Sequence, residues 1–272
     1  MVSIECQRVH EPIVMTIITT VDGVGTPEIR KYILRNPHTF VYSEPRFLQL
    51  VSEYLGAYCR WIVAHRGEEI SGILPYLVKE GPLGPVFNSL AYYGSNGGVI
   101  QAEKDNNSLI AVVDAFYKVA ANSNAVSATI ISNPLECNDD IYEACAKHDF
   151  RDERIGQFTH LPKNVDDLLK RFDDPRPRNI RRAIREGVSV RKGAAEALDF
   201  LYSTHVDNMR SIGGLAKKRE FFDAIPTNMQ GGDWTIFTAS LNEKPIAALL
   251  LFYFNRTVEY FTPVIIHSHR NT

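Results

Sequence analysis

The chain has 272 residues, which can hold two domains of ordinary size, and 44% of them are apolar, which is enough to form real cores. A formal net charge of −2 argues against general attraction to nucleic acid or anionic membranes, so a polyanion must meet a local basic patch. The four cysteines lie too far apart for a Cys-x-x-Cys motif or a dense disulfide framework, which predicts a protein of the reducing cytoplasm.

The amino-terminal segment does not have the composition of a targeting signal. Glu5, Arg8, His10 and Glu11 interrupt its apolar residues, unlike the apolar region of a secretory signal. No stretch of the chain approaches the roughly 18 consecutive apolar residues that a membrane-spanning helix needs. We therefore expect a soluble, cytoplasmic protein.

The first elements in chain order are two strands and a helix. Strands are predicted over residues 2–6 and 13–20, followed by a turn over residues 22–27, where Gly and Pro are frequent. A helix comes next, with Ser43 as its expected cap and Pro45 in its first turn. Its apolar face carries Phe47, Leu48, Val51, Tyr54 and Leu55.

A strand–turn–strand pattern follows this helix and recurs about 175 residues later. The first copy covers residues 61–74 and the second covers residues 234–250, each with a polar turn between two apolar runs. Such a recurrence indicates a duplicated domain, and chance is the alternative because hairpins with charged turns are common. The pattern predicts two related domains, at residues 1–162 and 163–272.

Between the two hairpins, strands and helices alternate. A break at residues 81–85 leads into a glycine-rich loop over residues 89–100, whose glycines indicate close approach to another group. Beyond it we expect helices over residues 107–121 and 139–148, a buried strand over 126–131 and another strand over 156–161. This alternation predicts an α/β fold with α+β mixed sheets.

The segment 173–192 carries the strongest local chemistry. A helix from about Pro177 to Gly187 places four arginines on one face, Arg178, Arg181, Arg182 and Arg185. The opposite face is predicted to turn an apolar stripe toward the core, Ile180, Ala183 and Ile184. Because clustered like charges repel, such a face favours an anionic partner such as phosphate. The alternative is a solvated face that nearby aspartates and Glu186 neutralise.

Several segments, taken in order, resemble the FemAB-like proteins of the GNAT acyltransferase superfamily. They are residues 40–50, the hairpin end 72–76, the loop 92–98, and the segments 179–188, 202–213, 221–222 and 258–264. The resemblance implies two GNAT-like domains in tandem. It also implies a transferase that acylates an amine, because family members move aminoacyl groups from aminoacyl-tRNA to peptidoglycan precursors or acylate other cell-envelope and polysaccharide precursors.

Two features of the chain depart from the family pattern. It has no room for the long helical hairpin that binds tRNA in some relatives, which counts against aminoacyl-tRNA as the donor. The donor is therefore left open between acyl-CoA and aminoacyl-tRNA. The chain also ends soon after its second hairpin, from which we expect an incomplete second domain. An exposed sheet edge there would allow two copies to pair as a homodimer.

The expected mechanism is direct attack of an amine on the acyl carbonyl, with no tightly bound cofactor and no metal. No Gly-x-Ser-x-Gly elbow is present, and no cysteine has a catalytic signature. Arg178, Arg181 and Arg182 are the candidates for phosphate contact. The resemblance adds Arg210 as an anion ligand. Further candidates are Tyr92 and Tyr93 for the acceptor, and Tyr260 for positioning the acyl group, although strand tyrosines are more often structural.

A non-catalytic binding protein is the rival interpretation. It would use the arginine helix to hold a phosphate-bearing ligand such as a nucleotide-linked sugar, a lipid phosphate or RNA. RNA is the weakest version, because no ladder of exposed aromatic residues accompanies the arginines. Ligand binding without turnover would distinguish this protein from the transferase.

Overall fold

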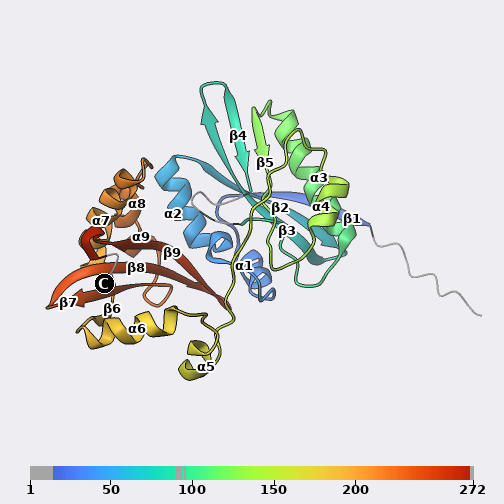
Figure 1. Ribbon diagram of the computed structural model, residues 1–272. Coiled ribbons are helices and arrows are strands. Elements are labelled where there is room, and N and C mark those ends of the chain that lie inside the picture. The colour runs from blue at the N-terminus through green and yellow to red at the C-terminus, as the bar shows by residue number, and fades with distance from the viewer. Residues whose placement is uncertain (1–14, 90–93, 95, 270–272) are drawn as a thin grey trace, which may run out of the picture.

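The computed structural model describes residues 15–89, 94 and 96–269. Two β-sheets lie side by side, each with helices packed on it (Figure 1). The first sheet has the strand order β1-β2-β3-β4-β5 and the second has the order β6-β7-β8-β9. The first sheet is mixed, since β4 and β5 are parallel and its other neighbouring strands are antiparallel, whereas every pair in the second sheet is antiparallel. The α/β class with mixed sheets is confirmed.

The first half of the chain forms the first sheet and its helices. In chain order these elements are β1 (Thr16–Asp22), α1 (Pro27–Ile33), η1 (Val41–Ser43), α2 (Pro45–Leu55), β2 (Tyr58–Arg66), β3 (Glu69–Gly81), β4 (Gly84–Asn88), α3 (Asn106–Asn122), β5 (Ser127–Thr129) and α4 (Asp139–Cys145). The strand expected over residues 2–6 lies outside the described residues.

The second half forms the second sheet. Its elements are α5 (Val165–Leu169), α6 (Arg176–Arg185), β6 (Ser189–Gly193), η2 (Ala195–Ala197), α7 (Leu198–Ser211), α8 (Arg219–Asp223), α9 (Ile225–Asn228), β7 (Trp234–Leu241), β8 (Lys244–Phe254), β9 (Thr257–Ile265) and η3 (His267–His269). Both sheets therefore start with a strand, insert helices, and continue with a hairpin and a fourth strand, and this repeated order agrees with the predicted tandem GNAT-like domains. The boundary between residues 162 and 163 stays a prediction.

The two predicted hairpins match in detail. Each has a two-residue turn, and Gly67 in the first and Asn242 in the second both have positive φ, at 65° and 50°. Such turns suit the twist of a hairpin. Each hairpin also carries a β-bulge just beyond the turn, at Ser71 and at Ile246. With the turns aligned, Trp61 corresponds to Ile236, two residues beyond Trp234, and both of these aligned side chains are fully buried.

The starts of two helices, α1 and α2, differ from what the sequence predicts. The cap of α2 is Glu44, whose side chain accepts hydrogen bonds from the N–H groups of Arg46 and Phe47, so the prediction of Ser43 is wrong. Ser43 belongs to the preceding 3₁₀ turn instead. The turn expected over residues 22–27 leads directly into α1, which was not predicted although Thr26 caps it.

Three further expectations are corrected by the structure. The strand expected over residues 126–131 is shorter, pairs only with β4, and is not buried, because Val126 is 51% exposed. No strand forms over residues 156–161; that segment runs exposed along the surface. Ile180 and Ile184 of α6 do not face the core, with 41% and 65% exposure. An amphipathic pattern predicts a helix, but it does not predict that another element packs on the apolar side of that helix.

One hydrophobic core joins the two halves. It contains α1, α2 and the adjoining face of the first sheet, together with α7, α8 and the facing side of the second sheet. Phe47 of α2 lies in this core, with ring centroids 5.3 Å from Phe252 of β8 and 6.2 Å from Phe261 of β9. A separate cluster under α3 covers the other face of the first sheet. The shared core fixes the two sheets relative to each other.

Candidate functional site

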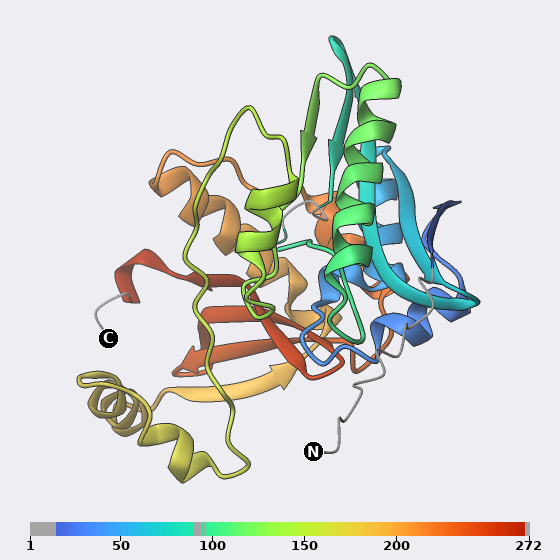
Figure 2. The ribbon, with the colours of Figure 1, turned by 90° about the vertical axis from the view of Figure 1, so that its right-hand side faces the viewer.

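The predicted arginine helix forms as expected but lies at the surface. α6 carries Arg178, Arg181 and Arg182, all exposed, on the side of the second sheet away from α7 to α9 (Figures 1 and 2). Arg182 pairs with Glu186 at 2.7 Å, and Arg181 donates to the carbonyl oxygen of Pro177 at 3.2 Å. The structure thus brings these three arginines together, and their role in phosphate contact stays a prediction.

The other predicted residues lie elsewhere. Arg210 is in the last turn of α7, on the opposite side of the second sheet from α6, and pairs with Asp207 at 3.2 Å. Tyr260 is in β9, 63% exposed, opposite Leu251. Tyr92 and Tyr93 lie outside the described residues. Arg210 therefore does not join the α6 arginines in one site.

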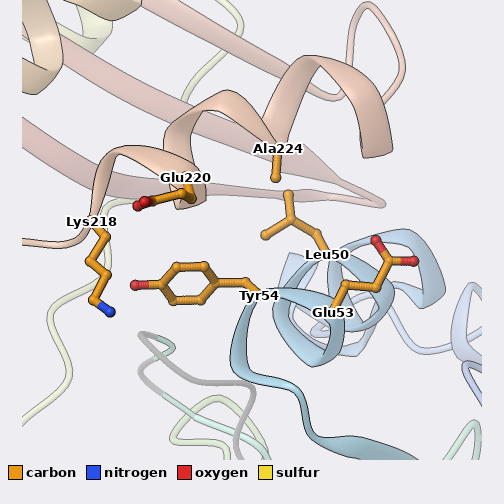
Figure 3. Close-up of a pocket in the computed structure, with 6 residues that line it drawn as sticks. All are labelled: Leu50, Glu53, Tyr54, Lys218, Glu220 and Ala224. Atoms are coloured by element: carbon orange, nitrogen blue, oxygen red, sulfur yellow. The ribbon is translucent and has the colours of Figure 1, made fainter.

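A hollow of about 390 Å³ lies between α2 and α8, where the two halves meet. Pockets at such junctions are frequent ligand sites, and this volume is in the range of small-molecule sites. Its lining consists of Leu50, Glu53, Tyr54, Lys218, Glu220 and Ala224. Figure 3 shows the phenol oxygen of Tyr54, the ammonium of Lys218 and the carboxylate of Glu220 on the same side of the hollow.

The sequence explains how these three groups are held. Tyr54 lies in the last turn of α2, which ends at Gly56 in a left-handed conformation, and its ring packs against Phe221 at 5.6 Å. Lys218 is the residue that precedes α8, and Glu220 lies in the first turn of that helix. The hollow therefore presents a hydroxyl, a cation and an anion around an apolar floor, which suits a small polar ligand that contains an amine.

The loop that carries Lys218 is fixed to α7 by His205. The ring Nε2 of this buried histidine accepts a hydrogen bond from the backbone N–H of Lys217 at 3.1 Å. Burial lowers the pKa of His205 to about 4, and the charge of Lys217 adds to this effect. The Lys217 ammonium lies 5.1 Å from the ring centroid of Phe261, and burial lowers its pKa as well.

A carboxyl group at the shared core also has a perturbed pKa. Glu259 of β9 hydrogen-bonds Tyr42 of η1, across the boundary between the two halves. Burial raises the pKa of Glu259, while the hydrogen bond from Tyr42 opposes the shift. Glu259 does not line the hollow, so it links the two halves rather than facing a ligand.

No pattern in the sequence revealed the hollow. The apolar periodicity of α2 placed Tyr54 on the core face of that helix, and Lys218 and Glu220 had no predicted role. No short motif marks the last two, and only the packing of α8 on α2 brings them to Tyr54. Within the described ranges, no cluster of three His, Cys, Asp or Glu side chains has metal-binding geometry. Among the helices described, none is both long and apolar enough to cross a bilayer.

Comparisons with known proteins agree with this fold. Residues 176–270 match the model of the acetyltransferase (GNAT) domain family. A crystal structure of FemX superposes with a TM-score of 0.68 at 14% identity, covering 90% of this chain and 80% of the FemX chain. A probable acetyltransferase of known structure, 17% identical, covers 54% of this chain and 98% of its own, with a TM-score of 0.33. No curated protein sequence matches.

These findings confirm the resemblance inferred from the sequence. The FemX likeness concerns the fold of nearly the whole chain, and the family match concerns its second half. Residues 176–270 thus match the GNAT acetyltransferase domain family, within a chain whose two-sheet fold is similar to that of FemX.

Proposed function

We propose that this protein is an acyl- or aminoacyltransferase that acylates an amine of a cell-envelope or polysaccharide precursor. The match of residues 176–270 to the GNAT acetyltransferase domain is the observation that carries this proposal. The FemX-like fold of the chain supports it. GNAT domains use acyl-CoA as a co-substrate, so acyl-CoA is the first donor to test and aminoacyl-tRNA the second.

The reaction is a direct transfer in the hollow between α2 and α8. The acceptor nitrogen attacks the acyl carbonyl carbon, the bond from that carbon to the donor sulfur or oxygen breaks, and the released thiolate or alkoxide takes up a proton. Glu220 accepts the proton that the amine loses. Lys218 and the Tyr54 hydroxyl stabilise the negative charge that develops on the carbonyl oxygen. All three line the hollow.

Ligand-induced stabilisation is the first test. A ligand that binds only the native state raises the thermal unfolding midpoint. A rise with acetyl-CoA supports a GNAT-type donor, whereas a rise with UDP-N-acetylglucosamine alone indicates an envelope-precursor acceptor with a different donor. No rise with either ligand, or with an aminoacyl-tRNA, would contradict the proposal.

Variants of the lining residues test the mechanism. Glu220→Gln is expected to lower kcat by roughly a hundredfold or more, because a positioned general base contributes that much. Tyr54→Phe and Lys218→Met are expected to lower kcat by removing donors to the oxyanion. Glu68→Gln, at the exposed tip of the first hairpin, is the control and should leave turnover unchanged. Equal kcat for Glu220→Gln and wild type would remove Glu220 from the mechanism.

The rival function, phosphate-ligand binding without turnover, has its support in the arginine face of α6. It predicts a thermal shift with phosphate-bearing ligands, lost in Arg181→Ala and Arg182→Ala, while no donor is consumed. The transferase predicts donor consumption that depends on Glu220. The two are therefore separated by one assay of turnover.

A further inference from the structure

α6 presents an outward face of arginines that no part of the described chain covers. Arg178, Arg181, Arg182 and Arg185 are exposed, and only Arg182 forms an ion pair with an acidic side chain within the described ranges. The helix has no extensive contact with any described helix or strand. Such an uncompensated row of guanidinium groups is costly unless an anionic partner meets it.

The surroundings of α6 concentrate this positive charge. Residues 161–192 contain ten Lys and Arg and five Asp and Glu, whereas the chain as a whole has a net charge of −2. Figures 1 and 2 show α5 and α6 together at one end of the molecule. The basic charge is therefore gathered at one end, which orients the molecule toward an anionic surface.

The shape of this face indicates what kind of anion it fits. The four arginines span eight residues of a helix, about 10 Å, along a convex surface. Neither the hollow between α2 and α8 nor a second one, lined by Lys192, Met229 and Trp234, includes a residue of α6. A convex row of guanidinium groups cannot enclose a small ligand, but it matches an extended array of phosphates.

Exposed aliphatic side chains beside the arginines favour lipid over nucleic acid. Ile184 follows Arg181 by three positions, which places it at the border between the arginine face and the apolar face of α6, and it is 65% exposed. Val190 of the adjoining β6 is 63% exposed. Residues 176–192 contain no aromatic side chain on which a nucleobase could stack. Arginines combined with small exposed aliphatic groups are typical of segments that bind the headgroup region of anionic bilayers.

We propose that α6 docks the protein onto an anionic phospholipid surface. The guanidinium groups of α6 contact lipid phosphates, and Ile184 contacts the boundary between headgroups and acyl chains. This placement goes beyond the proposed transferase and does not depend on it. It would hold the molecule at the surface where lipid-linked acceptors are found.

Vesicle co-sedimentation tests this docking. The intact protein is mixed with vesicles of phosphatidylcholine alone or with about one third phosphatidylglycerol, at low and high salt. Binding is expected only with phosphatidylglycerol and is expected to fall as salt rises. The double variant Arg178→Gln/Arg185→Gln should bind about 25-fold more weakly, since each arginine near an anionic surface contributes about fivefold.

A matched control removes the same charge elsewhere. Arg151→Gln/Arg154→Gln alters two exposed arginines of the segment before α5, each already paired with an acidic side chain. It should bind vesicles like wild type. Ile184→Ser should weaken the binding that persists at high salt. Both double variants should keep the wild-type unfolding midpoint, because their arginines are exposed.

Three results would overturn the docking. The first is equal binding to both kinds of vesicle, and the second is equal loss of binding in the two double variants. The third is binding to a 20-nucleotide RNA, or to inorganic pyrophosphate, that depends on Arg178 and Arg185 while vesicles are not bound. That last result would assign the α6 face to RNA or to a soluble phosphate.

Discussion

Phe47 of α2 and Phe252 of β8 meet edge to face across the boundary between the two halves, with ring centroids 5.3 Å apart and ring planes 78° apart. Both side chains are fully buried. This geometry is favourable for aromatic pairs beyond the area that they bury. The contact makes the packing of the first half depend on the second sheet.

The effect of Phe47→Ala follows from this contact. The variant is expected to lower the free energy of unfolding by about 3 to 5 kcal/mol, as large-to-small changes in tight cores do. A shared core further predicts one cooperative transition for both halves. Urea denaturation followed by fluorescence and by circular dichroism checks both points. Phe150→Ala is the control, because Phe150 is 81% exposed, and two separate transitions would contradict the shared core.

The buried His205 predicts a loss of stability in weak acid. Its pKa of about 4 lies below the ordinary value of about 6.5, so the unfolded chain binds a proton that the folded protein does not. Stability is therefore complete above pH 6.5 and falls as pH drops toward 4. At pH 5 the loss is about 2 kcal/mol. Denaturation of wild type at pH 7 and pH 5 measures it.

His205→Gln provides the comparison for this pH effect. The glutamine oxygen can accept the hydrogen bond from Lys217 N–H, which His205 Nε2 accepts in the wild type, but it does not titrate. The difference in unfolding free energy between pH 7 and pH 5 should be smaller in this variant by about 2 kcal/mol. An unchanged difference would show that His205 does not titrate as its burial requires.

The raised pKa of Glu259 predicts a pH dependence of stability opposite to that of His205. Burial raises its pKa, so the protonated carboxyl is favoured in the folded protein and stability is lost as pH rises through that raised pKa. Glu259→Gln keeps an acceptor for the Tyr42 hydroxyl and removes the buried charge. The variant should therefore have a higher unfolding midpoint than wild type at pH 8 and a smaller advantage at pH 4. A lower midpoint at pH 8 would mean that the ionised carboxylate is stabilised.

Local signals in the sequence were enough to find both hairpins and the helices α2, α3, α4 and α6, whereas α1, α8 and α9 were not predicted. Pro45 and Pro177 marked the first turns of α2 and α6, and the polar turns at Gly67 and Asn242 marked the hairpins. The expected strand over residues 156–161 failed because an apolar, β-prone segment needs a neighbour to pair with, and none is offered there.

Local sequence signals could not predict the candidate site. Tyr54 and Lys218 are brought to one hollow only by the packing of α2 on α8, and they are far apart in the chain. Glu259 and its hydrogen-bond partner Tyr42 are also far apart in the chain. The arginine pattern of α6 was read correctly as one face, whereas its apolar side had no partner that the sequence could reveal.

Turnover tests the central claim most directly. The protein is incubated with acetyl-CoA or an aminoacyl-tRNA and an amine-bearing peptidoglycan precursor, and the mass of the acceptor is followed by mass spectrometry. We expect the acceptor to gain the acyl group in wild type and in Glu68→Gln. In Glu220→Gln this gain should be slower by roughly a hundredfold or more. An acceptor that keeps its mass with every donor, while its binding still raises the unfolding midpoint, would contradict the transferase and leave a binding protein.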